Sequence, residues 1–326
     1  SYRVNGDKAA NFQKAVRCYY HALEVRTHET LAWAETQHCL GMAYADRDGG
    51  DKAANMEEAL AYFRRSLDVR ARHVAPLQWA DTNLHMGAAY TERVDGGKAA
   101  NMEEAMACYR RALEVWTRET VPLYWATAQH SMGRAYTERV DGDKAANLEE
   151  AVACYRRALL VRTRDAVPLP WTTTQRCLGL ALAERVEGDK TVNLKEAVAC
   201  FRRVVDVRTR ETMPLEWAAM QLKLADIYKL LMDGDKDAKQ ANKEEMMACY
   251  RRTLVVWTRE TAPNAWAETQ NRMGVAYAQV VDGDKAANLE EAVACHQRAL
   301  DVWTREAAPL HWATTQVYLA HVFKLQ

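Results

Sequence analysis

The sequence predicts an all-α protein, a right-handed superhelical α-solenoid built from seven helical hairpins. Three observations lead to this class. A unit of about 46 residues recurs along the whole of the 326-residue chain. The apolar residues of each unit follow the i, i+3, i+4, i+7 spacing of a helix, and no comparable segment shows the alternation of a strand. Because a single helical hairpin cannot bury its own apolar face, consecutive hairpins are expected to stack.

A tryptophan and an asparagine mark each repeat. The tryptophans lie 46 residues apart, except for one interval of 49 that reflects three extra residues near residues 233–241. They are Trp33, Trp79, Trp125, Trp171, Trp217, Trp266 and Trp312, and the asparagines are Asn11, Asn55, Asn101, Asn147, Asn193, Asn242 and Asn288. The units fill the chain, so we expect one solenoid domain over residues 1–326. Tyr2–Asp7 reads like the end of a repeat and the last unit stops within a helix, so a longer array is expected.

The first helix of each unit is expected to begin near a proline, a residue that is favourable in the first turn of a helix. In the third unit it would run from Pro122 through Trp125 to Tyr136 and end before the turn at Asp141-Gly142. The equivalent prolines are Pro76, Pro122, Pro168, Pro214, Pro263 and Pro309. A similar turn is expected at Asp282-Gly283.

The second helix is expected to begin at the asparagine of the repeat. Asn147 would cap the helix, and Glu150 three residues later would complete a start that resembles a capping box. Leu148, Tyr155 and Leu159 belong to its apolar face. Each repeat is therefore expected to be one hairpin of two amphipathic helices.

The composition excludes several classes of partner. Hydrophobic residues make up 49% of the chain and charged residues 27%, which is typical of an ordered protein. Lys plus Arg and Asp plus Glu are both 44, so no excess of basic charge points to nucleic acid or to a membrane surface. No apolar run approaches the roughly 18 residues of a membrane helix. We therefore expect neither a nucleic-acid nor a membrane partner.

The cysteines recur at equivalent places in the repeats. Equivalent sites of stacked helices should lie about 10 Å apart, whereas a disulfide requires Cα atoms within about 7 Å. Buried thiols in a reducing compartment are therefore expected, which favours a cytoplasmic location. The recurring cysteines are Cys18, Cys108, Cys154, Cys200, Cys249 and Cys295.

The residues predict no catalytic site, no cofactor and no metal site. The nine histidines form neither an HExxH motif nor a Cys/His quartet. The Asp-Gly-Asp-Lys turns lack the ligand spacing of an EF-hand, and no glycine-rich phosphate loop is present. His38 and His130 are therefore interpreted as groove or surface residues.

The repeat resembles the tetratricopeptide repeat (TPR). Met132-Gly133-x-x-Tyr136, followed by Ala151 and Tyr155, matches that family's skeleton. The unit is longer than the usual 34 residues, and in this respect it resembles the variety in kinesin light chains and in arrays attached to signalling ATPases or caspase-like proteases. The resemblance covers essentially all of the chain. It implies a solenoid that binds proteins or peptides and is not an enzyme.

Five positions of the first helix change from repeat to repeat while the positions between them stay fixed. Counted from the tryptophan they are −1, +2, +5, +6 and +9, a spacing that places them on one helix face. The exposed residues of the second helix barely change, as in Glu103-Glu104 and Glu149-Glu150. Exposure alone therefore does not explain the variation. In the family that the chain resembles, this face of the first helix lines the inner groove that grips peptides.

We therefore expect a protein or peptide segment to bind in a variable concave groove. The predicted groove residues are Glu35, His38, Met42, Asp81, Leu84, His85, Ala88, Thr127, His130, Arg134, Arg176, Leu180, Leu222, Lys223, Asp226, Glu268, Asn271, Arg272 and Val275. Arg134 and Arg176 could pair with a carboxylate of the ligand. Trp116, Trp257 and Trp303 replace an arginine of other repeats, and they would either form a second contact surface or pack against the next helix.

Three functions are compatible with this pattern. The first is a non-enzymatic scaffold that binds proteins or peptides. The second is a regulatory array within a larger signalling protein, an ATPase or a caspase-like protease, whose catalytic domain lies outside this chain. The third, a structural spacer, would not require a variable face. Leu319, Phe323 and Leu325 are expected to expose apolar surface, so end-to-end self-association is also expected.

Overall fold

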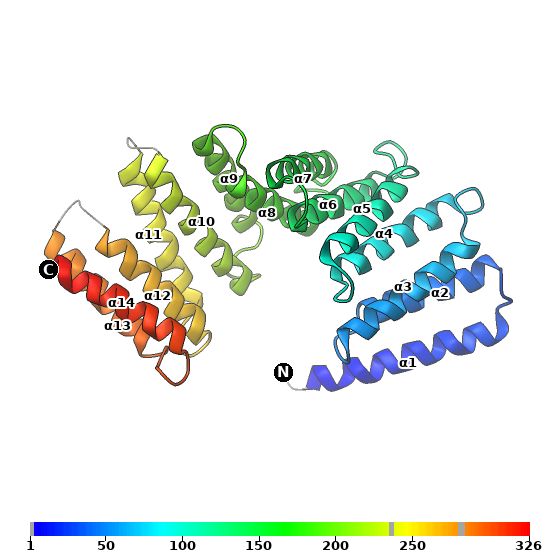
Figure 1. Cartoon of the computed structure of the whole chain (residues 1–326), viewed down its shortest axis with the longest axis horizontal. Coiled ribbons are helices and arrows are strands. Elements are labelled where there is room, and N and C mark those ends of the chain that lie inside the picture. The colour runs from blue at the N-terminus through cyan, green and yellow to red at the C-terminus, as the bar shows by residue number, and fades with distance from the viewer. Residues whose placement is uncertain (1–2, 235–237, 280–283) are drawn as a thin grey trace. The chain divides into compact units, whose positions relative to one another are not determined.

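The computed structural model describes residues 3–234, 238–279 and 284–326, and within these ranges it shows fourteen α-helices and no strand (Figure 1). Within residues 1–185 and within residues 186–326, consecutive helices pack against each other. The predicted fold class, an all-α solenoid of helical hairpins, is therefore confirmed.

The helices fall into two compact units, Ser1–Arg185 (unit 1) and Val186–Gln326 (unit 2). Unit 1 contains α1 (Arg3–Val25), α2 (Leu31–Ala45), α3 (Lys52–Val69), α4 (Pro76–Glu92), α5 (Lys98–Leu113), α6 (Pro122–Glu138), α7 (Lys144–Leu159) and α8 (Pro168–Glu184). Unit 2 contains α9 (Lys190–Val205), α10 (Pro214–Gly234), α11 (Lys239–Val256), α12 (Pro263–Ala278), α13 (Lys285–Leu300) and α14 (Pro309–Leu325). The expectation of one array over residues 1–326 stays a prediction.

The even-numbered helices α2 to α14 carry the repeat tryptophans and are called Trp helices here; the odd-numbered helices α1 to α13 carry the asparagines and are called Asn helices. Six of the Trp helices, α4, α6, α8, α10, α12 and α14, begin at a proline, as predicted. Proline fits there because the first amide groups of a helix have no partner within it.

The prediction that the asparagine caps the second helix is wrong. In the third repeat the N-cap of α7 is Asp143, whose Oδ1 accepts a hydrogen bond from the Ala145 amide at 2.9 Å. Asn147 lies one turn further inside the helix, where it is buried, and its side-chain amide donates to the Asp141 carbonyl at 2.9 Å. The asparagine therefore fastens the preceding turn to the helix.

The same device recurs in the neighbouring repeats. The side-chain amides of Asn55, Asn101 and Asn193 donate to carbonyl oxygens six residues earlier at 3.0, 2.9 and 2.8 Å. Each of these turns contains a glycine with φ between 77° and 84°, a conformation that side chains disfavour. These glycines are Gly50, Gly96, Gly142 and Gly188. The repeated Asn and Gly thus both serve the turn between the two helices.

A glycine packed against an aromatic ring closes the hairpins α2–α3, α4–α5 and α6–α7. A Cβ on Gly133 of α6 would lie 2.8 Å from the ring of Tyr155 on α7, so no other residue fits without displacement. Gly87 with Tyr109 makes the same contact. Tyr155 is 1% exposed, and burial of a ring of this size contributes roughly 2–3 kcal/mol. Gly133 therefore allows α6 and α7 to approach closely.

The recurring cysteines are packing residues, as predicted, with one exception. None of the eight cysteines of the chain, all in the described ranges, is joined in a disulfide. Five of the six recurring ones are buried, namely Cys108, Cys154, Cys200, Cys249 and Cys295, whereas Cys18 on α1 is exposed. Burial raises the pKa of Cys154 to about 11, so this thiol is unreactive at neutral pH.

Some sequence predictions concern the ends of the described ranges. The turn at Asp282-Gly283 and residues 235–237 of the expected insertion lie outside them. The segment expected to end a preceding repeat is helical from Arg3 onward, as part of α1. Phe323 is exposed and Leu325 half-buried, as expected, but Leu319 is buried. No helix of the described chain is long and apolar enough to cross a bilayer.

Candidate functional site

The variable positions of the repeats lie on the Trp helices, and in unit 1 these helices are neighbours. Helix α2 contacts α4, α4 contacts α6 and α6 contacts α8. In unit 2, α12 contacts α14 in the same way. Variable residues from consecutive repeats are therefore brought onto one surface within unit 1, which is called the Trp-helix face here. Which of the predicted residues a ligand could reach depends on their local contacts.

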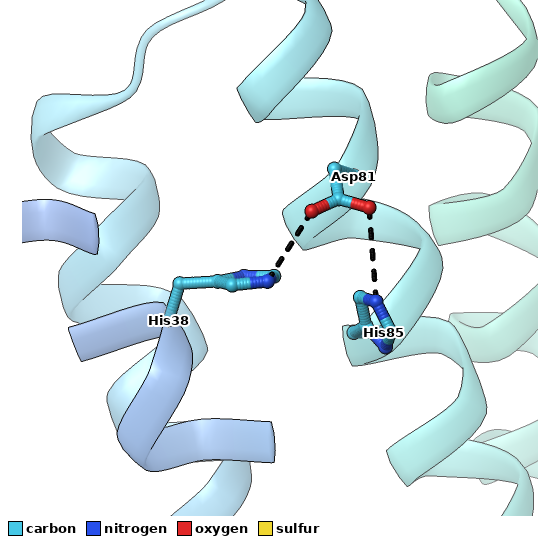
Figure 2. Close-up of side chains that lie close together, drawn as sticks. All are labelled: His38, Asp81 and His85. Carbon is cyan, nitrogen blue, oxygen red and sulfur yellow. Dashed lines mark ion pairs between the residues drawn. The ribbon is translucent and has the colours of Figure 1, made fainter. Parts of the chain in front are cut away.

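Several charged residues of the Trp-helix face are already paired within unit 1. Nη2 of Arg134 on α6 lies 3.4 Å from Oε1 of Glu92 on α4. Asp81 lies between His38 and His85 (Figure 2). Partly exposed pairs of this kind contribute at most about 1 kcal/mol each. Their main consequence is that part of the charge expected for a ligand already has a partner.

The equivalent residues of unit 2 are paired as well. Arg272 of α12 forms ion pairs with Glu268, one turn away at 2.6 Å, and with Asp226 of α10. Asn271 Oδ1 lies 2.8 Å from Nδ1 of the buried His296. These predicted groove residues therefore join α10, α12 and α13 to one another.

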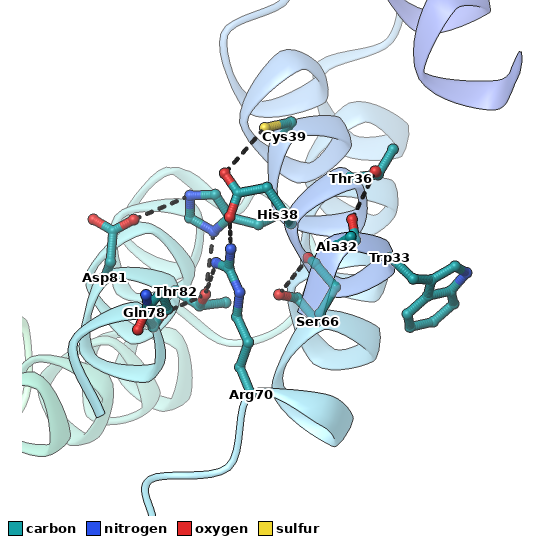
Figure 3. A network of polar contacts seen from close by, with 12 residues as sticks. Ala32, Trp33, Thr36, His38, Cys39, Ser66, Arg70, Gln78, Asp81 and Thr82 are labelled. Carbon is teal, nitrogen blue, oxygen red and sulfur yellow. Dashed lines mark hydrogen bonds and ion pairs between the residues drawn. The ribbon is translucent and has the colours of Figure 1, made fainter. Parts of the chain in front are cut away.

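Four of the predicted groove residues five places after the tryptophan are buried, which contradicts their assignment to the groove, whereas Arg176 and Asn271 at the same place are half-buried. His38, Leu84, His130 and Leu222 are between 4% and 8% exposed. His38 faces the next hairpin, where its Nδ1 lies 3.2 Å from Thr82 Oγ1 (Figure 3). In these four repeats the side chain lies between stacked helices, so its variation reflects the packing of each neighbouring pair.

The two interpretations of the tryptophans that replace an arginine can now be separated. Trp116 and Trp303 are 2% and 4% exposed, so they pack against the next helix rather than forming a second contact surface. Trp257 is half-buried. Arg70 and Arg162 are buried at the same place. The guanidinium of Arg70 forms an ion pair with Glu35, another predicted groove residue.

The residue just before the repeat tryptophan varies to suit this arginine or tryptophan. The rings of Trp116 and Tyr124 lie with centroids 5.1 Å apart, a favourable distance for aromatic pairs. Where the arginine is retained, Arg208 forms an ion pair with Glu216. Part of the variation on the first helix is thus explained by contacts within the protein.

The constant glutamates of the second helix also have a structural explanation. Glu149 of α7 pairs with Arg185, with Oε1 2.6 Å from Nε, and the carboxylate of Glu103 pairs with Arg139. The first glutamates of these constant pairs each hold the end of the next Trp helix. Their constancy therefore supports a ligand groove less strongly than the sequence suggests.

A smaller set of predicted residues remains accessible and has neither an ion pair nor a side-chain hydrogen bond among the described residues. Arg176 and Leu180 of α8 are half-buried, and Lys223 of α10 is exposed. The others are Met42, Ala88 and Val275. Met42 and Ala88 line a cavity of about 160 Å³ between α2 and α4. The accessible part of the face is thus apolar with isolated basic groups.

An apolar row at the start of the Trp helices was not predicted. Leu77, Leu123 and Leu169 follow the proline of α4, α6 and α8 and are 48–49% exposed, as is Leu31 of α2. The sequence signal for this row was a leucine two residues before four of the repeat tryptophans. A comparison of variable positions does not detect this leucine, because it is constant in these four repeats. Leu77 and Tyr124 also line a cavity of about 220 Å³. This leucine row extends the accessible surface of unit 1.

Solved structures with the same fold are TPR proteins. The C-terminal part of a TPR repeat-containing protein from Cytophaga hutchinsonii matches 90% of this chain and 92% of its own, with a TM-score of 0.57 and 14% identity. A chain of the APC/C hetero-tetramer Cut9–Hcn1 matches 97% of this chain, with a TM-score of 0.54 and 12% identity. This chain spans 46% of that one. No protein-family model matches the sequence, and no curated protein is significantly similar to it. At these identities the likeness concerns architecture: the chain has a TPR-type helical-repeat fold.

Proposed function

We propose that the chain is a non-enzymatic scaffold that holds a segment of a partner protein against the Trp-helix face of unit 1. The observation that carries the proposal is the adjacency of α2, α4, α6 and α8. It places the accessible variable residues and the leucine row on successive neighbouring helices. A surface that repeats its apolar contacts but varies its polar ones is suited to one extended or helical segment.

The chemistry of the face defines the segment that would fit. The leucine row offers an apolar contact on each Trp helix of unit 1, with about half of each side chain exposed. Arg176 is half-buried and has no hydrogen bond or ion pair in the described structure, so it is available to a carboxylate. Arg134 shares its charge with Glu92 and is a weaker partner. We therefore propose a segment with apolar side chains and at least one acidic residue.

Charge reversal at Arg176 tests this assignment. Arg176→Glu should weaken binding of the natural partner at least tenfold, because it replaces attraction by repulsion at a partly desolvated position. The matched control is Glu150→Lys on α7, an exposed charge on the Asn helices, which should change the affinity less than twofold. Titration calorimetry with the purified partner measures both. Equal effects of the two reversals would contradict the proposal.

The same fold supports a narrower family assignment and a second mode of association. We propose that the repeat belongs with the long, kinesin-light-chain-like TPR variety, because each hairpin pairs helices of 15–21 residues.

Helix α14 exposes Val317 at 68% and Phe323 at 54%. We propose that this face supports self-association of the chain.

Sedimentation over a wide range of concentrations tests the self-association. The chain should show a concentration-dependent increase in mass, and Phe323→Asp should shift it towards the monomer, because a carboxylate disfavours apolar contact. Leu310→Asp, at an exposed leucine at the start of the same helix, is the control. A strict monomer at every concentration would refute the proposal.

A further inference from the structure

Three side chains with metal-binding atoms converge from two neighbouring helices of unit 1 (Figure 2). His38 lies on α2, whereas Asp81 and His85 lie one turn apart on α4. His38 Nε2 is 3.3 Å from Asp81 Oδ2, and His85 Nε2 is 3.7 Å from Asp81 Oδ1. One ligand atom from each residue lies within 4.8 Å of the other two. No other trio of this kind occurs in the part of the chain that the structure describes.

The hydrogen bonds around His38 determine which ring nitrogen carries its proton (Figure 3). Arg70 Nη1 donates to Thr82 Oγ1 at 3.2 Å, and the Thr82 hydroxyl donates its one proton to the Gln78 carbonyl at 2.9 Å. Thr82 Oγ1 can then only accept from His38 Nδ1, which lies 3.2 Å away. The proton of the neutral ring is thus assigned to Nδ1, and the lone pair to Nε2.

This assignment leaves two acceptors facing each other. The lone pair of the neutral ring at His38 Nε2 points at the Asp81 carboxylate, and such an arrangement is unfavourable unless a proton or a metal ion lies between them. Metal-binding histidines are held in this manner, with the second nitrogen donating to a supporting group that fixes the ring. Thr82 has this supporting role here, and a metal ion would satisfy the lone pair and the carboxylate together.

The third and fourth repeats provide an internal comparison. His130 Nδ1 lies 3.2 Å from Thr174 Oγ1, which also accepts from Arg162 Nη1 at 3.0 Å, so the support of the histidine is the same. The residues at the places of Asp81 and His85 in the fourth repeat are Thr173 and Cys177. Packing between hairpins therefore explains a histidine at this place. It does not explain the added aspartate and second histidine.

Charge and access around the cluster also suit a cation. The guanidinium of Arg70 is offset by its ion pair with Glu35, and Asp46 acts electrostatically on His85. The side chains of Asp81 and His85 are 33% and 34% exposed, whereas that of His38 is 5% exposed. An ion can thus enter from solvent on the α4 side and reach a fixed, buried ligand.

We propose that His38, Asp81 and His85 form a binding site for a divalent transition-metal ion of the zinc class. Metal–nitrogen and metal–oxygen bonds of about 2.0–2.2 Å place tetrahedral ligand atoms roughly 3.3 Å apart. The Asp81 contacts are close to this spacing, and small side-chain rotations of His85 complete it. Two imidazoles and a carboxylate leave at least one coordination position for water. The ion would join the first and second hairpins, independently of any partner segment.

Titration calorimetry of the chelator-treated full chain with zinc chloride tests the site. The wild type should bind one Zn²⁺ at this site. Asp81→Thr and His85→Ser should each weaken that binding at least about 100-fold, more than the loss of a supporting residue costs. Both changes copy residues at the equivalent places of the third repeat, Thr127 and Ser131, so the variants are expected to fold. The visible spectrum of the Co²⁺ form should show tetrahedral coordination in the wild type but not in Asp81→Thr or His85→Ser.

Two control variants separate this site from adventitious binding. His130→Leu copies Leu84 at the equivalent place, and Cys39→Ser removes a nearby half-buried thiol. Both should bind Zn²⁺ as the wild type does. The proposal is overturned if the wild type shows no saturable binding. It is equally overturned if Asp81→Thr and His85→Ser bind normally, or if Cys39→Ser abolishes binding.

Discussion

At the scale of single residues, one buried histidine makes the stability of unit 2 depend on pH. His296 occupies the place where Tyr109, Tyr155 and Tyr250 fill other hairpins, and its side chain is fully buried. Its ring packs against Gly274. Burial lowers the pKa of His296 from 6.5 to about 4. The folded protein therefore requires the neutral ring, and protonation favours the unfolded chain.

The sign of the effect follows from proton linkage. Below pH 6.5 the unfolded chain binds a proton at His296 that the folded chain does not bind until about pH 4. The stabilisation is complete above pH 6.5 and is lost as the pH falls towards 4, by about 3 kcal/mol in total. His296→Phe, which copies Phe201, should remove most of this loss.

Urea unfolding at pH 7 and pH 5 measures the difference. His296→Phe should lose about 2 kcal/mol less stability between these two pH values than the wild type does. His73→Phe, at an exposed histidine, is the control and should behave like the wild type. An unchanged pH dependence in His296→Phe would contradict a lowered pKa of His296 in the folded protein.

At the scale of the helices, the hairpin depends on close approach at one glycine. The ring of Tyr155 lies where a side chain at Gly133 would begin, 2.8 Å from its Cβ, so Gly133→Ala must displace the ring or the helix. Overpacking of this kind costs about 1–3 kcal/mol, against a gain of up to about 1 kcal/mol in helix propensity. We predict a net loss of roughly 1–2 kcal/mol in the free energy of unfolding.

A glycine with free space around it provides the control. Gly49→Ala, with no atom within 4 Å of the added Cβ, should change the stability by less than about 0.5 kcal/mol. Denaturant unfolding followed by circular dichroism measures both variants. Equal stabilities of Gly133→Ala and Gly49→Ala would contradict the close packing of α6 on α7.

At the scale of the whole molecule, the stacking of the hairpins could be predicted because the residues that pack the helices together recur from repeat to repeat. The glycine and its facing ring recur in most of the hairpins, and their contact follows from helical spacing. The capping of α7 could not be assigned in this way, because Asn147 and Asp143 are both good N-caps and the turn geometry decides between them. The conformation of the turn before the helix therefore decides which of these two residues caps it.

The accessible surface was harder to predict than the fold, because the sequence of one helix face does not show which neighbouring helix covers it. His38 and His130 lie on the predicted variable face, yet stacking buries them against Thr82 and Thr174. The cluster of His38 with Asp81 could not be recognised either, because its ligands come from different repeats. Sequence comparison identified where variation is concentrated, and the structure separated packing from accessible surface.

The central claim is that a partner segment lies on the Trp-helix face of unit 1, and site-specific photo-crosslinking tests it directly. A photoreactive phenylalanine analogue would replace Leu180 of α8, a half-buried residue on that face, or Glu150 of α7, an exposed residue on the Asn helices. We predict that the partner is captured from Leu180, that Arg176→Glu abolishes this capture, and that Glu150 captures none. Capture from Glu150 but not from Leu180 would contradict the account.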